Sequence, residues 1–223
     1  MVEIGHRPLI WHIMKTYSKF GIDEFIICCG YKGFVIKEFF QNYNLYSSDI
    51  TFHLQTGEIE IHQERAEPWK ISVVDTGDET NTGGRLKRVA NYLDPGEEFF
   101  FTYGDGLADV DIGALLDFHR TSNRLVTVTA VQQPGRFGAL KLEGDKVTLF
   151  EEKPHGDGGW INGGYFVLDK RALEFVDGDK DSWETDSLPR LTEASQVSAF
   201  LHHSFWHPMD TLRDKVFLEH LWE

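Results

Sequence analysis

Hydrophobic positions along the chain follow two different spacings, and these spacings predict a series of helices and strands. Apolar residues recur at helical spacing over residues 8–20, with proline at the start and Gly21 after the end, a pattern typical of a helix with one buried face. The run 25–29 is continuously apolar and is closed by Gly30, which indicates a buried strand. A second helix is expected over 33–40, so the chain opens with the helix–strand–helix rhythm of a parallel sheet.

Elsewhere the pattern becomes strictly alternating, which predicts antiparallel pairs. One hairpin is expected over 50–63, around Thr56-Gly57, and another over 139–150, turning at Gly144-Asp145. Further strands are expected over 71–74, 98–103, 125–131, 165–168 and 197–201. Further helices are expected over 85–92, 112–118, 171–176 and 211–222, the last capped by Asp210 or Thr211. Together these elements predict an α/β fold with a mixed, mostly parallel central sheet, flanked by helices and carrying antiparallel insertions on one edge.

Composition and charge limit the classes of protein to which the chain can belong. The 223 residues, 41% hydrophobic and 26% charged, suffice for one domain with a sizeable core. A formal net charge of -14 argues against nucleic-acid and anionic-membrane partners, because both recruit clustered cations. No apolar stretch approaches the roughly 18 residues of a membrane span, and no signal peptide is expected. Cys28 and Cys29 are neighbours in a predicted strand, so we expect reduced thiols and a cytoplasmic location.

The strongest local sign of chemistry is an apolar strand that ends in Gly104-Asp105-Gly106. Ligands of open α/β sheets bind at the carboxyl edge, and a carboxylate there suits a divalent cation that bridges nucleotide phosphates. An ordinary turn after a strand is an equally good interpretation. Asp210 follows a second aromatic run; if it converges with Asp105, the two form a Mg²⁺ site. The alternative role of Asp210 is to cap the following helix.

Four other segments combine glycine or proline with a polar side chain. Gly83-Gly84-Arg85 precedes a predicted helix and resembles a phosphate or ribose clamp; the alternative is a flexible loop before a helix with a basic face. Arg136, between two glycines, could hold a phosphate or lie in a turn. Glu152-Lys153 suits a sugar phosphate, although an exposed turn ended by proline is the simpler interpretation. Asn162 precedes two glycines where a polar ligand could approach the backbone, and its alternative is a strand bulge.

Taken in order, these segments resemble one family over the whole chain: the glucose-1-phosphate cytidylyltransferases, which are sugar-nucleotide pyrophosphorylases. Each motif is short, but their order and extent are specific. The resemblance is carried by residues 1–5, 8–12, 26–33, 67–69, 74–77, 82–89, 103–106, 134–140 and 208–215.

The resemblance implies a Rossmann-like fold of the nucleotide-diphospho-sugar transferase type. It implies a Mg²⁺-dependent reaction in which CTP and α-D-glucose 1-phosphate give CDP-glucose and pyrophosphate. It also implies a homo-oligomer and a role in deoxysugar supply for surface polysaccharide such as O-antigen.

The resemblance also assigns residues to roles. Asp105 and Asp210 are expected to hold the metal, and Asp105, Arg85 and Lys153 to be catalytic, because charge neutralisation and positioning promote an in-line displacement. The expected nucleotide contacts are Thr80, Arg85, Tyr103 and Gly104. The expected sugar-phosphate contacts are Glu152, Lys153 and Asn162, to which the glycine-flanked Arg136 is added.

One part of the family pattern has no equivalent in these residues. The family opens with a strand, a Gly-Gly-x-Gly-Thr-Arg loop that binds the triphosphate, and a Lys-Pro-Lys segment. We therefore expect a single nucleotidyltransferase domain over residues 1–223 that lacks its first strand and phosphate-binding loop. Two alternatives stay open: a sugar-1-phosphate nucleotidyltransferase that uses UTP or dTTP, and a non-catalytic sugar-nucleotide-binding homologue, which the absent loop favours.

Overall fold

The computed structural model describes residues 1–63, 66–94, 96, 98–132, 139–143, 145–151 and 159–222. Its α-helices are α1 (Leu9–Ser18), α2 (Gly33–Gln41), α3 (Tyr43–Ser47), α4 (Thr82–Arg88), α5 (Ile112–Ser122), α6 (Leu188–Glu193) and α7 (Leu212–Trp222). Short 3-10 helices cover Ala90–Tyr92 and Lys170–Phe175, and Trp183–Ser187 is π-helical. Within the described part of the chain, no helix has the length and apolar character needed to cross a membrane.

Most of the strands belong to the centre of the molecule or to two hairpins. The strands are β1 (Glu3–Ile4), β2 (Arg7–Pro8), β3 (Glu24–Cys29), β4 (Asp49–His53), β5 (Glu58–Gln63), β6 (Lys70–Asp75), β7 (Glu98–Thr102), β8 (Gly106–Ala108), β9 (Val126–Val131), β10 (Ala139–Glu143), β11 (Lys146–Glu151), β12 (Ile161–Asp169), β13 (Val197–His202) and β14 (Trp206–Pro208).

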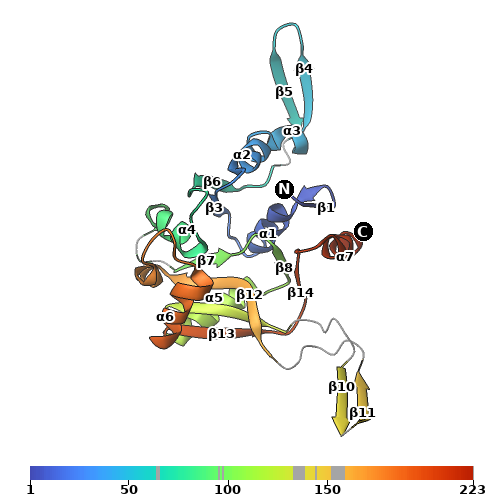
Figure 1. The fold of residues 1–223 in the computed structure, drawn as a ribbon. Helices are drawn as coiled ribbons and strands as arrows, with labels where there is room; N and C mark the ends of the chain where they lie inside the picture. Colours follow the sequence, from blue (N-terminus) through green and yellow to red (C-terminus); the bar gives the residue numbers. More distant parts are fainter. Residues whose placement is uncertain are drawn as a thin grey trace.

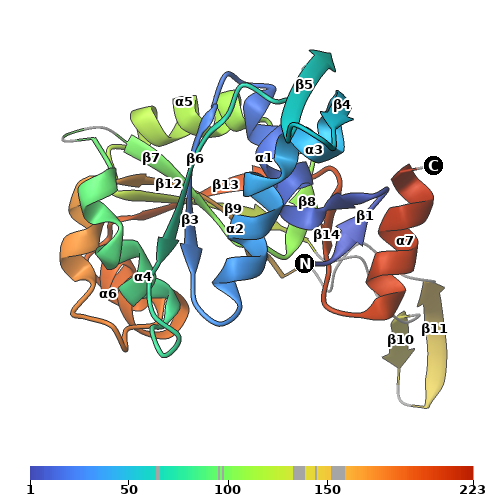
Figure 2. The same ribbon diagram turned by 90° about the horizontal axis from the view of Figure 1, so that it is seen from above.

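The central strands form two separate sheets (Figures 1 and 2). A four-stranded sheet has the order β13-β9-β12-β7, and β3 and β6 form a parallel pair. β12 is antiparallel to both of its neighbours, whereas β13 is parallel to β9. The predicted mixed sheet is therefore confirmed, and β12 is its antiparallel strand.

Side chains of β12 point alternately into two hydrophobic cores, because successive residues of a strand face opposite sides of a sheet. Tyr165 and Val167 pack with residues of α1, α5 and α7. Phe166 and Leu168 pack with residues of α4, α6 and the segment 172–183. All four side chains are fully buried. Helices therefore cover both faces of the sheet, which is the three-layer arrangement expected of an α/β domain.

Two antiparallel hairpins project from this body (Figure 1). The first, β4–β5, lies in the chain between β3 and β6; the second, β10–β11, lies between β9 and β12. The hairpins confirm the predicted antiparallel insertions. They leave the body in different directions (Figure 1).

Candidate nucleotide site

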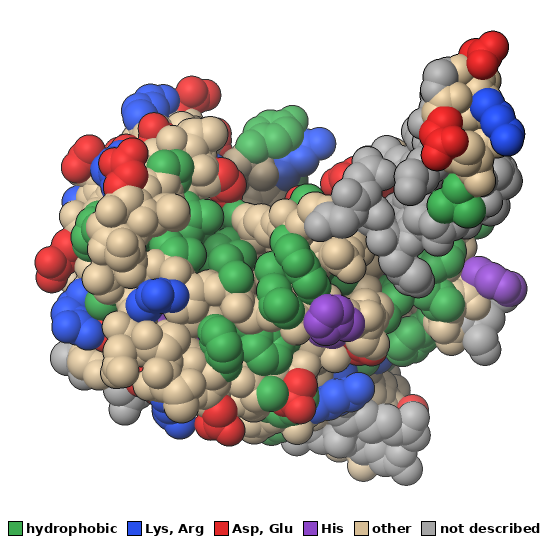
Figure 3. All heavy atoms as spheres, turned by 90° about the horizontal axis from the view of Figure 1, so that it is seen from below, with side chains coloured by type: hydrophobic (Ala, Val, Ile, Leu, Met, Phe, Trp, Pro, Cys, Tyr) green, Lys and Arg blue, Asp and Glu red, His purple; other side chains and the backbone are tan. Residues whose placement is uncertain are grey.

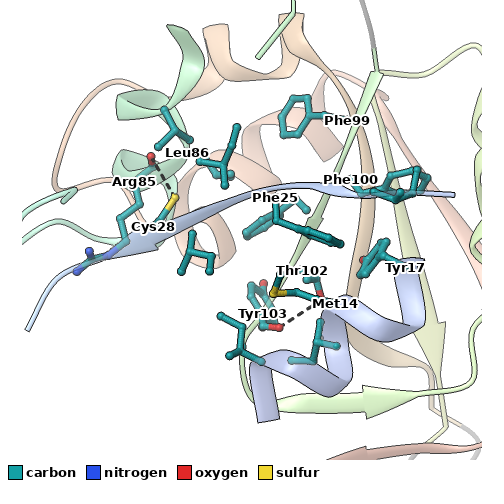
Figure 4. A pocket seen from close by; sticks show the side chains of 18 of the residues that line it. Met14, Tyr17, Phe25, Cys28, Arg85, Leu86, Phe99, Phe100, Thr102 and Tyr103 are labelled. Carbon is teal, nitrogen blue, oxygen red and sulfur yellow. Dashed lines mark hydrogen bonds between the residues drawn. The ribbon is translucent and has the colours of Figure 1, made fainter. Parts of the chain in front are cut away.

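A cavity of about 1050 Å³ lies between β3 and β7 and reaches the positions predicted to bind a nucleotide. Its lining includes Arg85, Tyr103, Gly104 and Asp105. In Figure 4, side chains of β3 and β7 face the same space, with α1 on one side and α4 on the other. The cavity therefore joins the apolar interior of the sheet to the polar residues at the end of β7.

The pairing of β8 with β14 brings the two predicted metal ligands together. Gly106 lies opposite Pro208, and the backbone N–H of Met209 donates to the carbonyl oxygen of Asp105 at 2.7 Å. Partial desolvation and, after it, the charge of Asp210 raise the pKa of Asp105. Two carboxylates held this close repel each other unless a cation lies between them, so this donor set fits Mg²⁺, which binds one or two carboxylates and completes its shell with water and substrate phosphates. Among the described residues, no group of three or more His, Cys, Asp or Glu side chains forms a further metal site.

The N-terminus of α7 is capped by Thr211. Its Oγ1 accepts a hydrogen bond from the backbone N–H of Asp214 at 3.3 Å, and Asp214 Oδ2 accepts from the backbone N–H of Thr211 at 2.9 Å. This reciprocal pair resembles a capping box. Of the two caps predicted from the sequence, Thr211 is the one observed, so the Asp210 carboxylate is not required to begin the helix.

A network of hydrogen bonds and ring contacts fixes Tyr103 beside Gly104. Asn162 Nδ2 donates to the Tyr103 hydroxyl at 3.1 Å, while Asn162 Oδ1 accepts from the backbone N–H of Gly164 at 2.8 Å. Gly164 has φ +78°, and a Cβ there would lie 2.8 Å from Tyr103 Cδ2. The register of β12 is irregular after Asn162. The strand-bulge interpretation is therefore confirmed, and the bulge places Asn162 against Tyr103.

Glu184 also contacts Tyr103, although the sequence did not mark it as a site residue. Its Oε2 accepts from Thr82 Oγ1 at 2.7 Å and from Ser182 Oγ at 2.9 Å, and it hydrogen-bonds the Tyr103 hydroxyl. Burial opposes ionisation of Glu184, but these hydrogen bonds together lower its pKa. Burial and then the bond to Glu184 raise the pKa of Tyr103. Glu184 belongs to the π-helical segment, which is distant from Tyr103 in the sequence. No local sequence motif indicates that the two residues are in contact.

Arg85 is held against the loop that follows β6. Its Nη1 donates to Thr76 Oγ1 at 2.7 Å, and its Nη2 lies 3.5 Å from the carbonyl oxygen of Asp78. Thr80, in the same loop, is buried. In Figure 4 the Arg85 guanidinium points away from Tyr103. Arg85 and Thr80 thus form a second group of predicted nucleotide contacts.

Gly83 and Gly84 have a different role from the predicted phosphate clamp. Both are buried within α4, and the backbone N–H of Gly84 donates to the carbonyl oxygen of Asp181 at 3.1 Å. A Cβ at Gly84 would lie 2.6 Å from the backbone of Asp179. These glycines therefore allow α4 to pack closely on the segment 179–183. α4 begins at Thr82, earlier than the predicted range 85–92.

The described site residues fall into two groups, one around the carboxylate pair and one on the loop before α4. The first contains Tyr103, Gly104, Asp105, Asn162 and Asp210. The second contains Thr80 and Arg85. Three predicted site residues, Arg136, Glu152 and Lys153, lie outside the described residues.

Comparison with known proteins supports the predicted α/β fold and identifies proteins that are similar to this chain in sequence and in structure. The family model described as "Nucleotidyl transferase" matches residues 1–214. The chain is 56% identical over 223 residues to the glucose-1-phosphate cytidylyltransferase of Salmonella typhi, covering all of this chain and 87% of that protein. It is 36% identical, with the same coverage, to a probable glucose-1-phosphate cytidylyltransferase of Bacillus subtilis. The crystal structure of HddC from Yersinia pseudotuberculosis superposes with a TM-score of 0.71 at 21% identity, covering 100% of this chain and 89% of that one.

Proposed function

Because this chain belongs to the nucleotidyl transferase family and, within it, to the glucose-1-phosphate cytidylyltransferases, we propose that it transfers a cytidylyl group from CTP to α-D-glucose 1-phosphate. The products are CDP-glucose and pyrophosphate. The observation that carries the proposal is the juxtaposition of Asp105 and Asp210 through the β8–β14 pairing, beside the cavity that Arg85 and Tyr103 line. A protein that only bound sugar nucleotides would not require this carboxylate pair.

The reaction needs positioning and charge neutralisation rather than a covalent intermediate. A phosphate oxygen of the sugar attacks the α-phosphorus of CTP, a new P–O bond forms, and the bond to pyrophosphate breaks. Asp105 and Asp210 would hold Mg²⁺, which neutralises phosphate charge when bound. Arg85 is one of the two arginines that line the cavity, the other being Arg120, and its guanidinium can pair with an anionic phosphate.

Tyr103 and Asn162 orient the ligand in this proposal. Glu184 and Asn162 hold the Tyr103 hydroxyl from two elements, so the ring keeps one position at the end of β7. Gly104 adds no side chain, and a Cβ there would meet no atom within 4 Å. A nucleotide can therefore approach the backbone between Tyr103 and Asp105. The sugar-phosphate roles of Glu152, Lys153 and Arg136 remain part of the proposal.

The test is release of pyrophosphate from CTP, glucose 1-phosphate and Mg²⁺, with UTP and dTTP as competing nucleotides. We expect CTP to be preferred and Asp105→Asn to lower turnover by about 100-fold or more, because it removes half of the carboxylate pair. Asp117→Asn is the matched control, since Asp117 is an exposed carboxylate on α5. Preference for UTP or dTTP would favour the second nucleotide class. Binding of CDP-glucose without turnover would favour a non-catalytic homologue.

A homo-oligomer and a cytoplasmic location complete the proposal. Exposed hydrophobic side chains lie on the β4–β5 hairpin and also on and beside β13, an edge strand; those near β13 include Trp160, Leu201 and Phe205. Figure 3 shows hydrophobic side chains gathered on the underside of the body. A second copy of the chain would cover such surfaces. Cys28 and Cys29 are both free thiols, as expected in a reducing compartment.

A further inference from the structure

The paired strands β8 and β14 carry the two carboxylates of the candidate metal site at one end and a separate polar cluster at the other. Asp105 directly precedes β8 and Asp210 follows β14, so both lie at the same end of this antiparallel pair. Asp109 directly follows β8 and lies at the opposite end. Extended chain of this length spans about 13 Å between Asp105 and Asp109, which keeps Asp109 out of the shell of a cation held by Asp105.

The backbone ladder of β8 and β14 is too short to fix the two strands by itself. The two strands have three opposed positions and no further neighbour among the described strands, and a two-stranded pair is at best marginally stable alone. Pro208, opposite Gly106, has no backbone N–H and cannot donate to the ladder. The separation of the two carboxylates therefore depends on contacts made by side chains.

Three side chains close the end of the pair that is remote from the carboxylates, and we call Asp109, His202 and Ser204 the Asp109 clamp. Ser204 Oγ donates to Asp109 Oδ2 at 2.6 Å. His202 Nε2 lies 3.0 Å from Asp109 Oδ1 and 3.0 Å from the carbonyl oxygen of Phe205. Both of these oxygens are acceptors, so Nε2 carries a hydrogen and donates. The backbone N–H of Asp109 donates to the same Phe205 carbonyl at 3.1 Å.

The Asp109 clamp also joins this pair of strands to the four-stranded sheet. His202 is the last residue of β13 and is 8% exposed, so it is a fixed point of that sheet. Ser204 lies in the connection from β13 to β14, and Asp109 lies in the connection from β8 to α5. In Figures 1 and 2, β8 and β14 lie between the four-stranded sheet and α7.

Two other hydrogen bonds tie the strands to β12, but each holds a single strand. The Tyr165 hydroxyl donates to the carbonyl oxygen of Gly106 in β8 at 3.1 Å. Trp206 Nε1 of β14 donates to the carbonyl oxygen of Gly163 at 2.8 Å. The Asp109 clamp differs from both, because its hydrogen bonds hold the chain after β8 directly against the chain before β14.

We propose that Asp109 is a positioning residue for the metal site, which fixes β8 against β14 and thereby the separation of Asp105 from Asp210. The proposal rests on the proposed function, in which these two carboxylates hold Mg²⁺. A slip of one residue would move Asp210 by about 3.3 Å relative to Asp105, and Mg²⁺ demands a near-ideal octahedral arrangement of its ligands. Without the clamp, a smaller fraction of the protein holds the binding arrangement, so the apparent affinity for the cation falls by that fraction.

The first measurement is the affinity of residues 1–223 for Mn²⁺, a cation that accepts the same oxygen ligands as Mg²⁺. Titration with and without CTP is followed by the loss of the electron paramagnetic resonance signal of free Mn²⁺, and Asp105→Asn identifies the ion bound at this site. We expect Asp109→Ala to raise the Kd by about fivefold or more, because it removes two hydrogen bonds to a charged group. Asp117→Ala, at an exposed carboxylate on α5, is the matched control and should leave the Kd unchanged.

Variants of Ser204 separate the hydrogen bond from other effects of the substitution. Ser204→Ala should also raise the Kd, whereas Ser204→Thr retains the hydroxyl and should keep the value of the parent. The double variant of Asp109→Ala and Ser204→Ala should bind no more weakly than Asp109→Ala alone, because both changes remove the same hydrogen bond. If Asp109→Ala fails to fold, the comparison of the two Ser204 variants decides the outcome.

Turnover provides the second measurement. We expect Asp109→Ala to raise the KM for Mg²⁺ by about fivefold or more and to keep kcat at saturating Mg²⁺ within about twofold of the parent, since Asp109 positions the carboxylates and does not contact substrate. Thermal unfolding is recorded for every variant. A variant with lower Tm but an unchanged Kd for Mn²⁺ would show a purely structural role for Asp109 and would overturn the proposal.

The two measurements distinguish failure of this proposal from failure of the proposed function. Weaker Mn²⁺ binding by Asp109→Ala and Ser204→Ala, without turnover by the parent on any nucleotide, would support the clamp and contradict the proposed function. Turnover of CTP by the parent, with Mn²⁺ affinity unchanged in Asp109→Ala, would do the reverse. A parent whose Mn²⁺ binding does not depend on Asp105 would overturn the positioning role of Asp109.

Discussion

Gly84 illustrates how a residue with a recognisable local pattern can act through packing instead of ligand binding. Adjacent glycines before a basic helix are typical of a phosphate loop, yet the space for a Cβ at Gly84 is occupied by the backbone of Asp179 at 2.6 Å. Backbone atoms cannot move aside as a flexible side chain can. The sequence pattern is the same for both roles, and only the distant segment 179–183 distinguishes them.

Gly84→Ala should therefore destabilise the protein. We expect a loss of about 1–3 kcal/mol in the free energy of unfolding, because α4 must move away from the segment it covers. Gly178→Ala is the matched control, since a Cβ there would meet no atom within 4 Å, and we expect it to stay within about 1 kcal/mol of the parent. Urea denaturation followed by circular dichroism measures both. Equal stability of the two variants would contradict the packing role.

His119 should make stability depend on pH. The side chain is buried, its Nδ1 lies 2.9 Å from Thr127 Oγ1, and burial lowers its pKa below the ordinary value. The unfolded chain therefore binds a proton more readily than the folded protein below about pH 6.5, so stability falls as the pH drops through that value toward the folded pKa.

His119→Asn keeps a polar atom near Thr127 but does not titrate in this range. We expect the fall in Tm between about pH 7.5 and about pH 5.5 to be smaller in the variant than in the parent. Differential scanning calorimetry at both pH values provides the comparison. An unchanged pH dependence would mean that His119 is protonated in the folded protein or does not contribute to this transition.

At the scale of elements, the β4–β5 hairpin is an amphipathic ribbon. Phe52 lies opposite Ile59 and Ile50 opposite Ile61, while on the other face Thr51 bonds His62 at 2.7 Å and His53 bonds Glu60 at 2.8 Å. Phe52 and Ile59 are both more than half exposed. A two-stranded ribbon is only marginally stable alone in water, so its apolar face requires a covering surface.

Replacing the apolar face of this ribbon should weaken self-association. We expect the double variant Phe52→Thr, Ile59→Thr to lower the molar mass measured by light scattering after size exclusion, because threonine preserves strand propensity but removes the apolar contact. Glu60→Gln, on the polar face, should leave the mass unchanged. A monomeric parent, or a double variant of unchanged mass, would contradict the role of this face in a homo-oligomer.

The sequence predicted the long, periodic elements and missed those that depend on distant contacts. The helix from Leu9, the strand from Glu24 and the hairpin around Gly57 carry a clear local period. The short strands β8 and β14 carry none, because each exists through pairing with the other. Asp105 and Asp210 can nevertheless be predicted as site residues from the sequence, since each follows an apolar run. Glu184 cannot be predicted in this way, because its approach to Tyr103 is set by tertiary packing.

At the scale of the whole molecule, the two central sheets should differ in local stability. β9 and β12 lie inside a four-stranded sheet and carry fully buried side chains such as Val126 and Phe166. The β3–β6 pair has no ladder to that sheet in the described residues and borders the cavity between β3 and β7 instead. Opening of this pair therefore breaks fewer buried contacts than opening of the larger sheet.

Native-state hydrogen exchange checks this difference. We expect amides of β3 and β6 to exchange at least about tenfold faster than those of β9 and β12 in residues 1–223. Mass spectrometry of peptic fragments resolves the two regions. Exchange at one common rate would mean that the sheets open together as a single cooperative unit.

The pairing of β8 with β14 also has a consequence for how the protein is made. Translation releases Asp105 from the ribosome long before Asp210, and the two become neighbours only when Pro208 aligns with Gly106. A nascent chain that stalls in between displays a single carboxylate and has little affinity for a divalent cation. In the proposed function, nucleotide chemistry at this site therefore begins only after Asp210 has left the ribosome, and products terminated before Asp210 should not consume CTP.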